Sequence, residues 1–242
     1  LLPDGNETTL PQLCRSHSRA WELISLALHL GTDATKGVDA DGKSVALGGN
    51  ATARALLESV IEQPTPRGVN VLSRLPFDST RKYAAVSLGG REKLTLFIGA
   101  PERLFPFASE QMHADGSIVP FSRKRIEESI KKQTQNGRRV LALAVSRENV
   151  PAPFHESGIR GSLCYLGAFC LQDALRNEAP SAVAGLQDAG VHVVMITGDS
   201  PETAANIGRA CGIVNRECDI ILSGEELSRL SDSYVGEILP HL

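Results

Sequence analysis

The sequence predicts an α+β domain, an antiparallel sheet flanked by helices, joined to part of an α/β domain with a parallel, doubly wound sheet. Upstream of Asp173, predicted strands follow one another in neighbouring runs, as in antiparallel sheets. Downstream of it, helical and strand patterns alternate, which is typical of a parallel sheet. We therefore expect one domain at residues 1–172 and a second at residues 173–242.

Three helices are expected in the first domain. Apolar residues recur at helical spacing through Ser16–Leu30, and Gly31 ends that pattern. A second helix is expected over Asn50–Gln63, where Pro64 stops it. The third is the charged, amphipathic stretch Arg123–Asn136.

Five strands complete the first domain. They are predicted at Val69–Pro76, Arg81–Leu88, Lys93–Ile98, Arg139–Val145 and Ser162–Leu171. The pair Gly89-Gly90 predicts a hairpin between the second and third of these strands. The Gly- and Asp-rich segment Gly31–Gly49 and the turn-rich segment Asn149–Gly161 are expected to be loops.

The second domain is expected to run helix, strand, helix, strand. These elements are predicted at Ala179–Ala189, Val191–Ile196, Pro201–Cys211 and Asp219–Leu222. The first strand ends in Thr197-Gly198-Asp199, and Ser200 is the expected N-cap of the helix that follows. Proteins of the α/β class place phosphate and metal chemistry at such strand-to-helix turns, although an ordinary connection has the same pattern.

The composition excludes several classes of protein. With 42% hydrophobic and 22% charged residues the chain resembles an ordinary soluble globular protein, and its net charge of −3 argues against nucleic-acid binding. No apolar run approaches the roughly 20 residues that cross a bilayer, and the N-terminus does not resemble a signal peptide. Five cysteines without CxxC spacing and six histidines without ligand spacing predict neither a disulfide framework nor a metal site.

Five segments, taken in order, resemble one protein family. They are GGNATARALL (48–57), LPFDSTRK (75–82), GAPERL (99–104), DALR (173–176) and TGDSPETA (197–204). Each is similar to a segment of the P-type (E1-E2) cation-transporting ATPases, and the motif sequences are most similar to those of bacterial relatives of calcium pumps. In that family a nucleotide-binding domain is inserted into a phosphorylation domain of the haloacid-dehalogenase-like, Rossmann-like type. The resemblance thus implies a nucleotide-binding domain at 1–172 and a partial phosphorylation domain at 173–242.

Phe77 and Lys82 are the nucleotide contacts that the resemblance implies most directly. The matching aromatic ring of the family stacks on adenine, an interaction worth about 1–3 kcal/mol in nucleic-acid binders. The matching lysine lies near the nucleotide phosphates as a point charge. Taken without the resemblance, a strand phenylalanine is more often a core residue, and such a lysine is more often an exposed surface residue.

Other nucleotide contacts are implied at Gly99, Ala100, Thr52 and Arg139. Gly99 allows close approach of a ligand or of another backbone, and Arg139 would reach the phosphates. Arg138 is the competing assignment for that arginine, because a shift of one residue exchanges the faces of a strand. Either Asn50 or Thr52 can cap the helix that follows Gly49.

The sequence departs from the family pattern at two of the expected contacts. Ile98 precedes Gly99 where the family usually has a lysine that lines the nucleotide pocket. Ala53 stands where relatives usually have an acidic residue that contacts the adenine amino group. Loss of a charged partner typically costs about 1.5–3 kcal/mol, so weak ATP binding is expected.

Catalytic roles in the second domain are implied for Thr197, Gly198, Asp199 and Asp173, and a nucleotide contact for Arg176. Thr197 and Gly198 would hold the aspartyl-phosphate, and Asp199 would face nucleotide and Mg²⁺. Asp199 also suits helix capping. Asp173 and Arg176 can equally form a salt bridge at the hinge.

The resemblance implies an ATP-binding cytoplasmic portion of a cation pump, with Ca²⁺ as the expected ion and ATP and Mg²⁺ as cofactors. The family's DKTGTLT segment, which carries the phosphorylated aspartate, and its GDGxND segment do not occur in the sequence. We therefore expect a soluble part of a membrane pump, at the cytoplasmic face of the cell membrane, unable to turn over ATP alone. Its partners would be the remaining phosphorylation domain and the actuator and transmembrane domains, and its last 70 residues would lack strand partners.

Two alternatives remain. One is an interaction domain that acts without nucleotide and retains a degenerate ATP site. The other, a free-standing phosphatase of the haloacid-dehalogenase type, is disfavoured because the nucleophile motif DxDx is missing.

Overall fold

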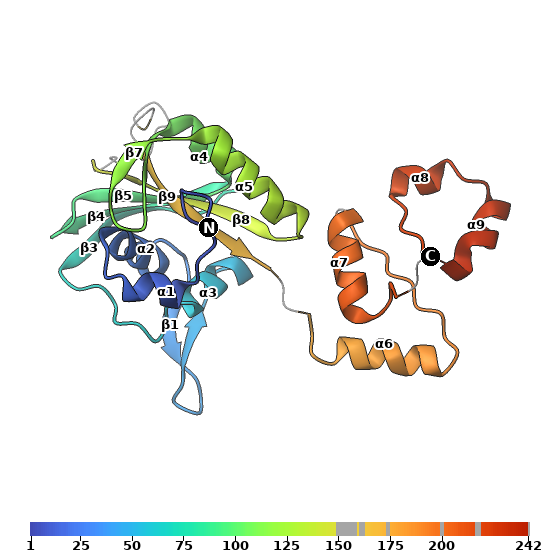
Figure 1. Ribbon diagram of the computed structural model, residues 1–242. Helices are drawn as coiled ribbons and strands as arrows, with labels where there is room; N and C mark the ends of the chain where they lie inside the picture. The colour runs from blue at the N-terminus through green and yellow to red at the C-terminus, as the bar shows by residue number, and fades with distance from the viewer. Residues whose placement is uncertain (149–158, 160–162, 173–174, 199–200, 216–218, 242) are drawn as a thin grey trace. The chain divides into compact units, whose positions relative to one another are not determined.

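The protein is described by a computed structural model, shown in Figure 1, over residues 1–148, 159, 163–172, 175–198, 201–215 and 219–241. The chain divides into two compact units. The first comprises Leu1–Ile130 and Val140–Leu171, and the second comprises Lys131–Arg139 and Gln172–Leu242.

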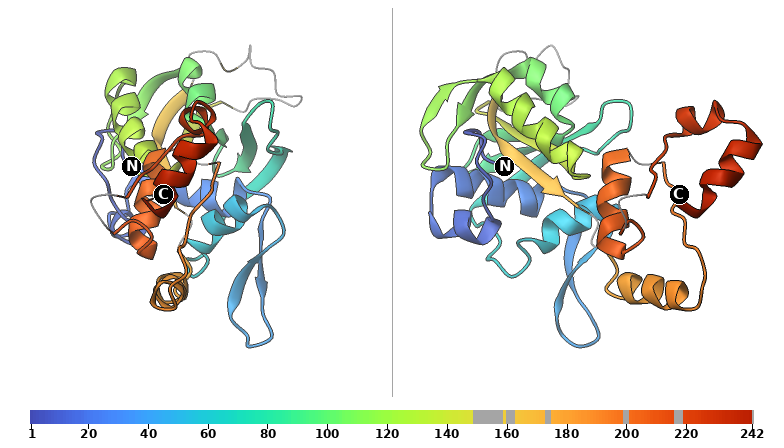
Figure 2. Two further views of the ribbon diagram at one scale, coloured as in Figure 1. Left: turned by 90° about the vertical axis from the view of Figure 1, so that its right-hand side faces the viewer. Right: turned by 45° about the vertical axis from the view of Figure 1, so that its right-hand side comes forward.

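Among the described residues, seven strands form one mixed sheet in the order β3-β4-β5-β8-β9-β6-β7. Their bounds are β3 Val69–Leu75, β4 Tyr83–Gly90, β5 Leu94–Gly99, β6 Ala108–Met112, β7 Ile118–Pro120, β8 Arg139–Ser146 and β9 Leu163–Leu171. Strands β3, β4, β5 and β8 pair antiparallel, whereas β6 pairs parallel to β9. A separate antiparallel hairpin, β1 (Thr35–Val38) and β2 (Ser44–Leu47), extends away from the large sheet in Figure 2.

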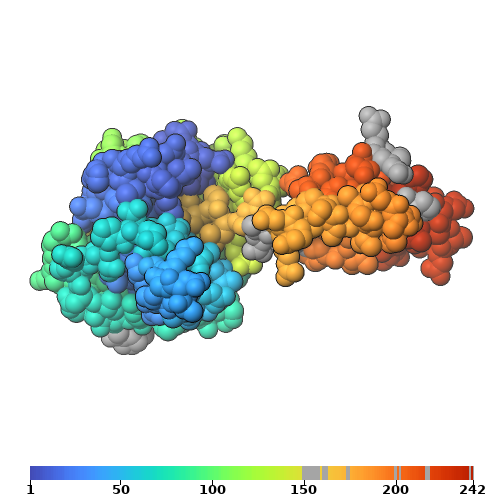
Figure 3. Space-filling model, turned by 90° about the horizontal axis from the view of Figure 1, so that it is seen from below, coloured from blue at the N-terminus to red at the C-terminus, as the bar shows by residue number. Residues whose placement is uncertain are grey.

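Helices cover both faces of the large sheet. They are α1 Leu10–Arg15, α2 Arg19–Leu30, α3 Ala51–Glu58, α4 Pro101–Leu104 and α5 Arg123–Gln135, with a short 3₁₀ turn at Phe105–Phe107. In Figure 1, α1, α2 and α3 lie on one face of the sheet, and α4 and α5 lie on the other. Figure 3, seen from below, shows the N-terminal segments in blue to teal covering the first of these faces.

Alternation along the strands gives each face its own hydrophobic core. In β5, Leu96 and Ile98 join the core beneath α2, while Phe97 joins the core on the opposite face, which includes Ile126 of α5. Successive strand residues point to opposite faces of a sheet, so a sheet covered on both sides shows an unbroken apolar run. The fully buried run of β5 is therefore explained by helices on both faces.

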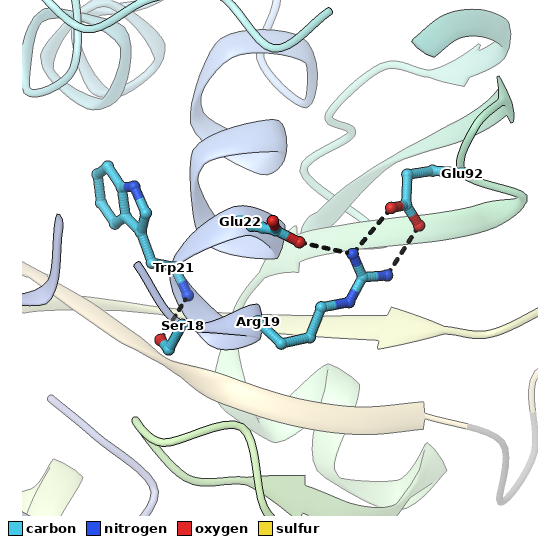
Figure 4. Close-up of polar contacts among 5 residues, drawn as sticks. All are labelled: Ser18, Arg19, Trp21, Glu22 and Glu92. Atoms are coloured by element: carbon cyan, nitrogen blue, oxygen red, sulfur yellow. Dashed lines mark hydrogen bonds and ion pairs between the residues drawn. The ribbon is translucent and has the colours of Figure 1, made fainter. Parts of the chain in front are cut away.

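An ion-pair cluster fixes the start of α2, as Figure 4 shows. The Ser18 hydroxyl accepts a hydrogen bond from the Trp21 backbone N–H at 3.3 Å and caps the helix. The two terminal nitrogens of Arg19 each donate to an oxygen of Glu92 at 2.8 Å, and one also donates to Glu22 at 3.0 Å. Because Glu92 lies in the turn between β4 and β5, this cluster attaches the helix to the sheet.

Within the first unit, the structure adds elements that the sequence pattern did not predict. Strands β1 and β2 lie in the segment expected to be a loop, and α1, β6 and β7 had no predicted counterpart. Helix α3 ends at Glu58, earlier than predicted, where the Ser59 hydroxyl donates to the Leu56 carbonyl. These strands have at most five residues, too few to show the alternation on which strand prediction depends.

The second unit contains helices α6 (Ala179–Asp188), α7 (Pro201–Cys211), α8 (Gly224–Ser228) and α9 (Asp232–Ile238), then a 3₁₀ turn at Leu239–His241. The predicted helices Ala179–Ala189 and Pro201–Cys211 are thus confirmed. The strands predicted at Val191–Ile196 and Asp219–Leu222 are wrong, since neither segment is in a strand and Ile196 is 95% exposed. A strand exists only when a neighbour completes its hydrogen-bond ladder, and from Gln172 onward none of the described residues is in a strand.

Candidate functional site

The loop between β3 and β4, residues 76–82, carries two predicted nucleotide contacts. Phe77 is 47% exposed, so the interpretation of this ring as a core aromatic is wrong. The Lys82 side chain is also exposed, and its backbone adopts a left-handed conformation with φ of 59°. The loop thus presents an aromatic ring and an ammonium group to the surroundings from one short segment.

Hydrogen bonds within the loop hold its backbone in place. One carboxylate oxygen of Asp78 accepts from the backbone N–H groups of Thr80 at 2.9 Å and Arg81 at 3.0 Å. The Asp78 carbonyl accepts from the Lys82 N–H at 2.6 Å. The hydrogen bonds from the Arg81 and Thr80 N–H groups lower the pKa of Asp78, so its carboxylate remains an acceptor at neutral pH.

Gly99 and Ala100 lie directly against this loop. A Cβ added at Gly99 would lie 2.5 Å from the Lys82 carbonyl oxygen and would also clash with Tyr83. The Ala100 N–H donates to that same carbonyl at 2.8 Å. Gly99 is therefore required for the close approach of another backbone, one of the two reasons the sequence left open.

An exposed carboxylate accompanies Lys82. Glu102, in α4, lies with one oxygen 3.6 Å from the Lys82 Nζ, and both side chains are more than half exposed. A pair of this kind contributes about 0–1 kcal/mol and is easily exchanged for another anion. The Lys82 ammonium is therefore available to a stronger anionic partner.

The two positions that depart from the family pattern are both buried. Ile98 is 6% exposed, and its Cδ1 lies 3.1 Å from the position of a Cβ added at Gly31. Ala53 is 9% exposed and packs in a small cluster with Ala34, Ala46, Leu57 and Ile61. Each position is thus part of the apolar packing of this chain, which favours a small or aliphatic residue there.

Thr52 lies in the first turn of α3 and is half-buried. The helix is capped by Asn50, whose side-chain oxygen accepts from the Ala53 N–H at 2.9 Å, which decides between the two predicted caps. Arg139 is the exposed first residue of β8. Arg138 donates to the Gln133 side-chain oxygen at 2.5 Å, and both arginines belong to the second unit.

Of the residues predicted for the phosphate site, the structure describes Thr197, Gly198 and Arg176. Thr197 and Gly198 are exposed and follow a segment without strand structure. Arg176 is exposed, and its carbonyl accepts from the Ala179 N–H at 2.9 Å. Asp173 and Asp199 lie outside the described residues. The part of the chain that the structure describes contains no group of three or more His, Cys, Asp or Glu residues that could hold a metal.

Sequence reasoning missed the residues that shape the loop, namely Asp78, Arg81, Glu102 and Arg103. A sequence signal existed for Asp78 alone, since an aspartate followed by serine and threonine often accepts hydrogen bonds from the next backbone N–H groups. Nothing in the sequence indicates that the Arg103 Nε donates to the Arg81 carbonyl at 3.2 Å.

Comparison with known proteins shows the family to which the chain belongs. The family model described as "P-type ATPase, cytoplasmic domain N" matches residues 21–178, which include both sides of the 76–82 loop and most of the large sheet. The chain belongs to the P-type cation-transporting ATPases.

Similar proteins in this family are named as cation-transporting or calcium-transporting ATPases. The chain is 35% identical over 169 residues to "Probable cation-transporting ATPase F" of Mycobacterium tuberculosis, covering 67% of this chain and 19% of that protein. It is 32% identical over 202 residues to "Calcium-transporting ATPase 1" of Yarrowia lipolytica, covering 79% and 21%. It is 31% identical over 170 residues to "Cation-transporting ATPase pma1" of Synechocystis, covering 69% and 18%.

The chain thus spans about a fifth of the length of these P-type ATPases. Within the described residues, no helix has the length and apolar character that a membrane crossing requires. The mixed sheet flanked by helices is compatible with an α+β nucleotide-binding domain of this family.

Proposed function

We propose that residues 1–172 bind ATP as the nucleotide-binding domain of a cation-transporting ATPase. One observation carries this proposal. Phe77 and Lys82 lie on the same hydrogen-bonded 76–82 loop, where Phe77 is 47% exposed and the Lys82 side chain is 53% exposed. A half-exposed ring offers a stacking surface for adenine, and an ammonium group on the same loop offers a charge for phosphates.

The apolar character of positions 53 and 98 predicts weak binding. Neither Ala53 nor Ile98 can supply the charge that relatives use, and both side chains are engaged in packing. Affinity then rests on stacking by Phe77 and on the charge of Lys82, with Gly99, Ala100 and Thr52 supplying backbone and hydroxyl groups. The family resemblance adds Arg139 as a proposed phosphate contact. A dissociation constant of roughly 1 mM, about −4 kcal/mol, is the expected strength.

In the intact pump the domain would bring the ATP γ-phosphate to an aspartate in a part of the protein that this sequence does not include. Thr197, Gly198, Asp199, Asp173 and Arg176 would contribute to the phosphorylation domain at 173–242. Its haloacid-dehalogenase-like fold is proposed to form when neighbouring strands are present. Mg²⁺ is proposed to arrive with the triphosphate as part of the substrate, and Asp199 would face it.

Ca²⁺ is proposed as the transported ion for two reasons. One relative is named a calcium-transporting ATPase, and the motif sequences are most similar to those of bacterial relatives of calcium pumps. The domain would work at the cytoplasmic face of the membrane, together with the actuator and transmembrane domains of the same pump.

Titration of the 242-residue chain with ATP, with and without Mg²⁺, by isothermal calorimetry tests the proposal. Wild type should bind at about millimolar strength, and Phe77→Ala should abolish measurable binding. Tyr234→Ala removes another half-exposed ring and serves as the matched control. Equal binding by wild type and Phe77→Ala would contradict the proposed site.

The second candidate function is an interaction domain that has lost nucleotide. The burial of Ala53 and Ile98 among apolar residues favours it, because the two polar contacts are replaced by packing. A folded wild-type chain that does not bind ATP would bring this alternative forward.

A further inference from the structure

We infer that Asp78 and Arg81 are positioning residues of the proposed nucleotide site, which fix the 76–82 loop so that Phe77 and Lys82 are presented together before nucleotide arrives. The inference rests on the proposed function. Neither residue needs to contact the nucleotide for this role, because both act through the backbone of the loop.

Asp78 uses both its side chain and its carbonyl within the loop. A single carboxylate oxygen accepts from the Thr80 and Arg81 N–H groups, and the carbonyl accepts from the Lys82 N–H. The residue directly after Phe77 thereby sets the path of the chain as far as Lys82. Removal of the carboxylate would leave two loop N–H groups without their acceptor.

The Arg81 guanidinium contacts other parts of the loop and the residue that follows it. Its Nη2 donates to the Pro76 carbonyl at 3.0 Å, and its guanidinium carbon lies 5.9 Å from the centre of the Tyr83 ring. The Arg81 side chain is half-buried, and its Nε is buried without a hydrogen-bond partner. A guanidinium held in this way joins the two ends of the loop and is poorly placed to act as a phosphate ligand.

The adjoining strand and helix complete the frame. The Arg103 Nε donates to the Arg81 carbonyl, and the Ala100 N–H donates to the Lys82 carbonyl. These bonds close around Lys82, which has the left-handed φ of 59° that side chains rarely adopt. The backbone at Lys82 therefore depends on the frame, and so does the direction in which its side chain leaves the chain.

A frame of this kind raises affinity without new contacts. Binding orders mobile segments at a cost, and a loop that is already ordered avoids it. Loss of the frame should therefore weaken nucleotide binding while the rest of the domain remains folded.

The experiment is a calorimetric titration of the 242-residue chain with MgATP for wild type, Asp78→Ala, Asp78→Asn and Asp115→Ala. Asp115 is the matched control, because its carboxylate oxygen accepts from the Ser117 N–H at 2.9 Å in a turn between β6 and β7. Asp78→Ala should weaken binding by about threefold to tenfold. Asp78→Asn should restore it, since an amide oxygen can accept the same bonds, and Asp115→Ala should bind like wild type.

The role of Arg81 is tested by the salt dependence of binding. Lys82→Met should lose less affinity at high salt than at low salt, because it removes a direct charge contact. Arg81→Met should weaken binding by a similar factor at both, because it removes a structural bond. A loss in Arg81→Met that shrinks with salt in the same way would overturn the positioning role of Arg81.

The remaining outcomes are also decisive. Wild-type affinity in Asp78→Ala, or equal losses in the Ala and Asn variants, would overturn the role of Asp78 while leaving the proposed function intact. Failure of wild type to bind would overturn the proposed function and this inference together. Thermal melting of each variant verifies that it is folded, and the Arg81 series provides an independent result if Asp78→Ala unfolds.

Discussion

Gly99 of β5 approaches Lys82 so closely that a Cβ on Gly99 would lie 2.5 Å from the Lys82 carbonyl oxygen. The contact joins the end of β5 to the loop that carries Phe77, and the backbone on both sides is fixed by strand pairing between Tyr83 and Gly99. The glycine of this motif thereby connects the fold of the sheet to the geometry of the proposed site.

Gly99→Ala should lower the free energy of unfolding by about 1–3 kcal/mol, because the added methyl group must push backbone atoms apart. Urea denaturation measures the change. Gly185→Ala is the matched control: apart from its chain neighbours and the nearby backbone of helix α6, no atom lies within 4 Å of its added Cβ, so a gain of about 0.5–1 kcal/mol is expected there. Equal stability of Gly99→Ala and wild type would contradict the close approach.

Glu102→Gln should tighten ATP binding, because Lys82 then loses the carboxylate that competes with phosphate at 3.6 Å. The expected gain is at most about fivefold, the equivalent of a surface ion pair of 0–1 kcal/mol. Calorimetry at low salt measures it. Glu127→Gln, which removes the partner of Arg123 on α5, should leave the dissociation constant unchanged. Weaker binding by Glu102→Gln would indicate that the carboxylate itself assists the nucleotide.

The Arg19–Glu92 pair should make the free energy of unfolding depend on pH in the acidic range. The side-chain hydrogen bond from Arg19 lowers the folded-state pKa of Glu92 below its ordinary value of 4.5. Its contribution is thus fully present above the unfolded-state pKa and is lost as the pH falls through the folded-state pKa. Urea denaturation from neutral pH to below pH 4.5 should show wild type and Glu92→Gln converging in acid.

Removal of Arg19 at neutral pH gives the size of this contribution. Arg19→Ala should lower stability by about 1–2 kcal/mol, a value reduced for solvent screening because its side chain is 41% exposed. Arg123→Ala, which breaks the exposed pair with Glu127, should cost no more than about 0.5 kcal/mol. Equal costs for both variants would show that the bidentate geometry confers no special strength.

Ile98→Lys should destabilise the fold before it can improve ATP binding. The Ile98 side chain belongs to the core beneath α2 and is 6% exposed, so a buried ammonium group would cost several kcal/mol, about 3 or more. Thermal melting measures this effect, with Ile98→Val as the control at about 0.5–1.5 kcal/mol. A folded Ile98→Lys chain with unchanged stability would show that the side chain escapes to solvent.

The two units should differ in how strongly their amides are protected from hydrogen exchange. Amides of Val193–Ile196 should exchange close to the rate of an unstructured peptide, whereas those of Phe97 and Leu143 in the centre of the sheet should be strongly protected. Protection of Val193–Ile196 comparable to that of β5 would show that this segment pairs as a strand in solution.

The local pattern of residues was sufficient to predict much of the first unit. Helix α2 and strands β3, β4, β5, β8 and β9 follow from apolar periodicity, because core side chains must recur with the spacing of each element. The segments around Phe77 and Gly99 resemble those of the P-type ATPases, the family to which the chain belongs.

The second unit marks the limit of such reasoning. The apolar run Val191–Ile196 has the composition of a buried parallel strand, yet it is not in a strand and Ile196 is almost fully exposed. Apolar composition records what a segment can bury, whereas a strand also requires a neighbouring chain for its N–H and C=O groups.

The sequence by itself determined which segments form the central strands and which residue types stand at the proposed site. Only the tertiary structure decided that Ile98 and Ala53 belong to apolar packing, that Asp78 and Arg81 hold the loop, and that Gly99 meets the backbone of Lys82. Local spacing governs which face of an element is apolar, but contacts between distant segments depend on how strands and helices pack, and no local pattern specifies those distances.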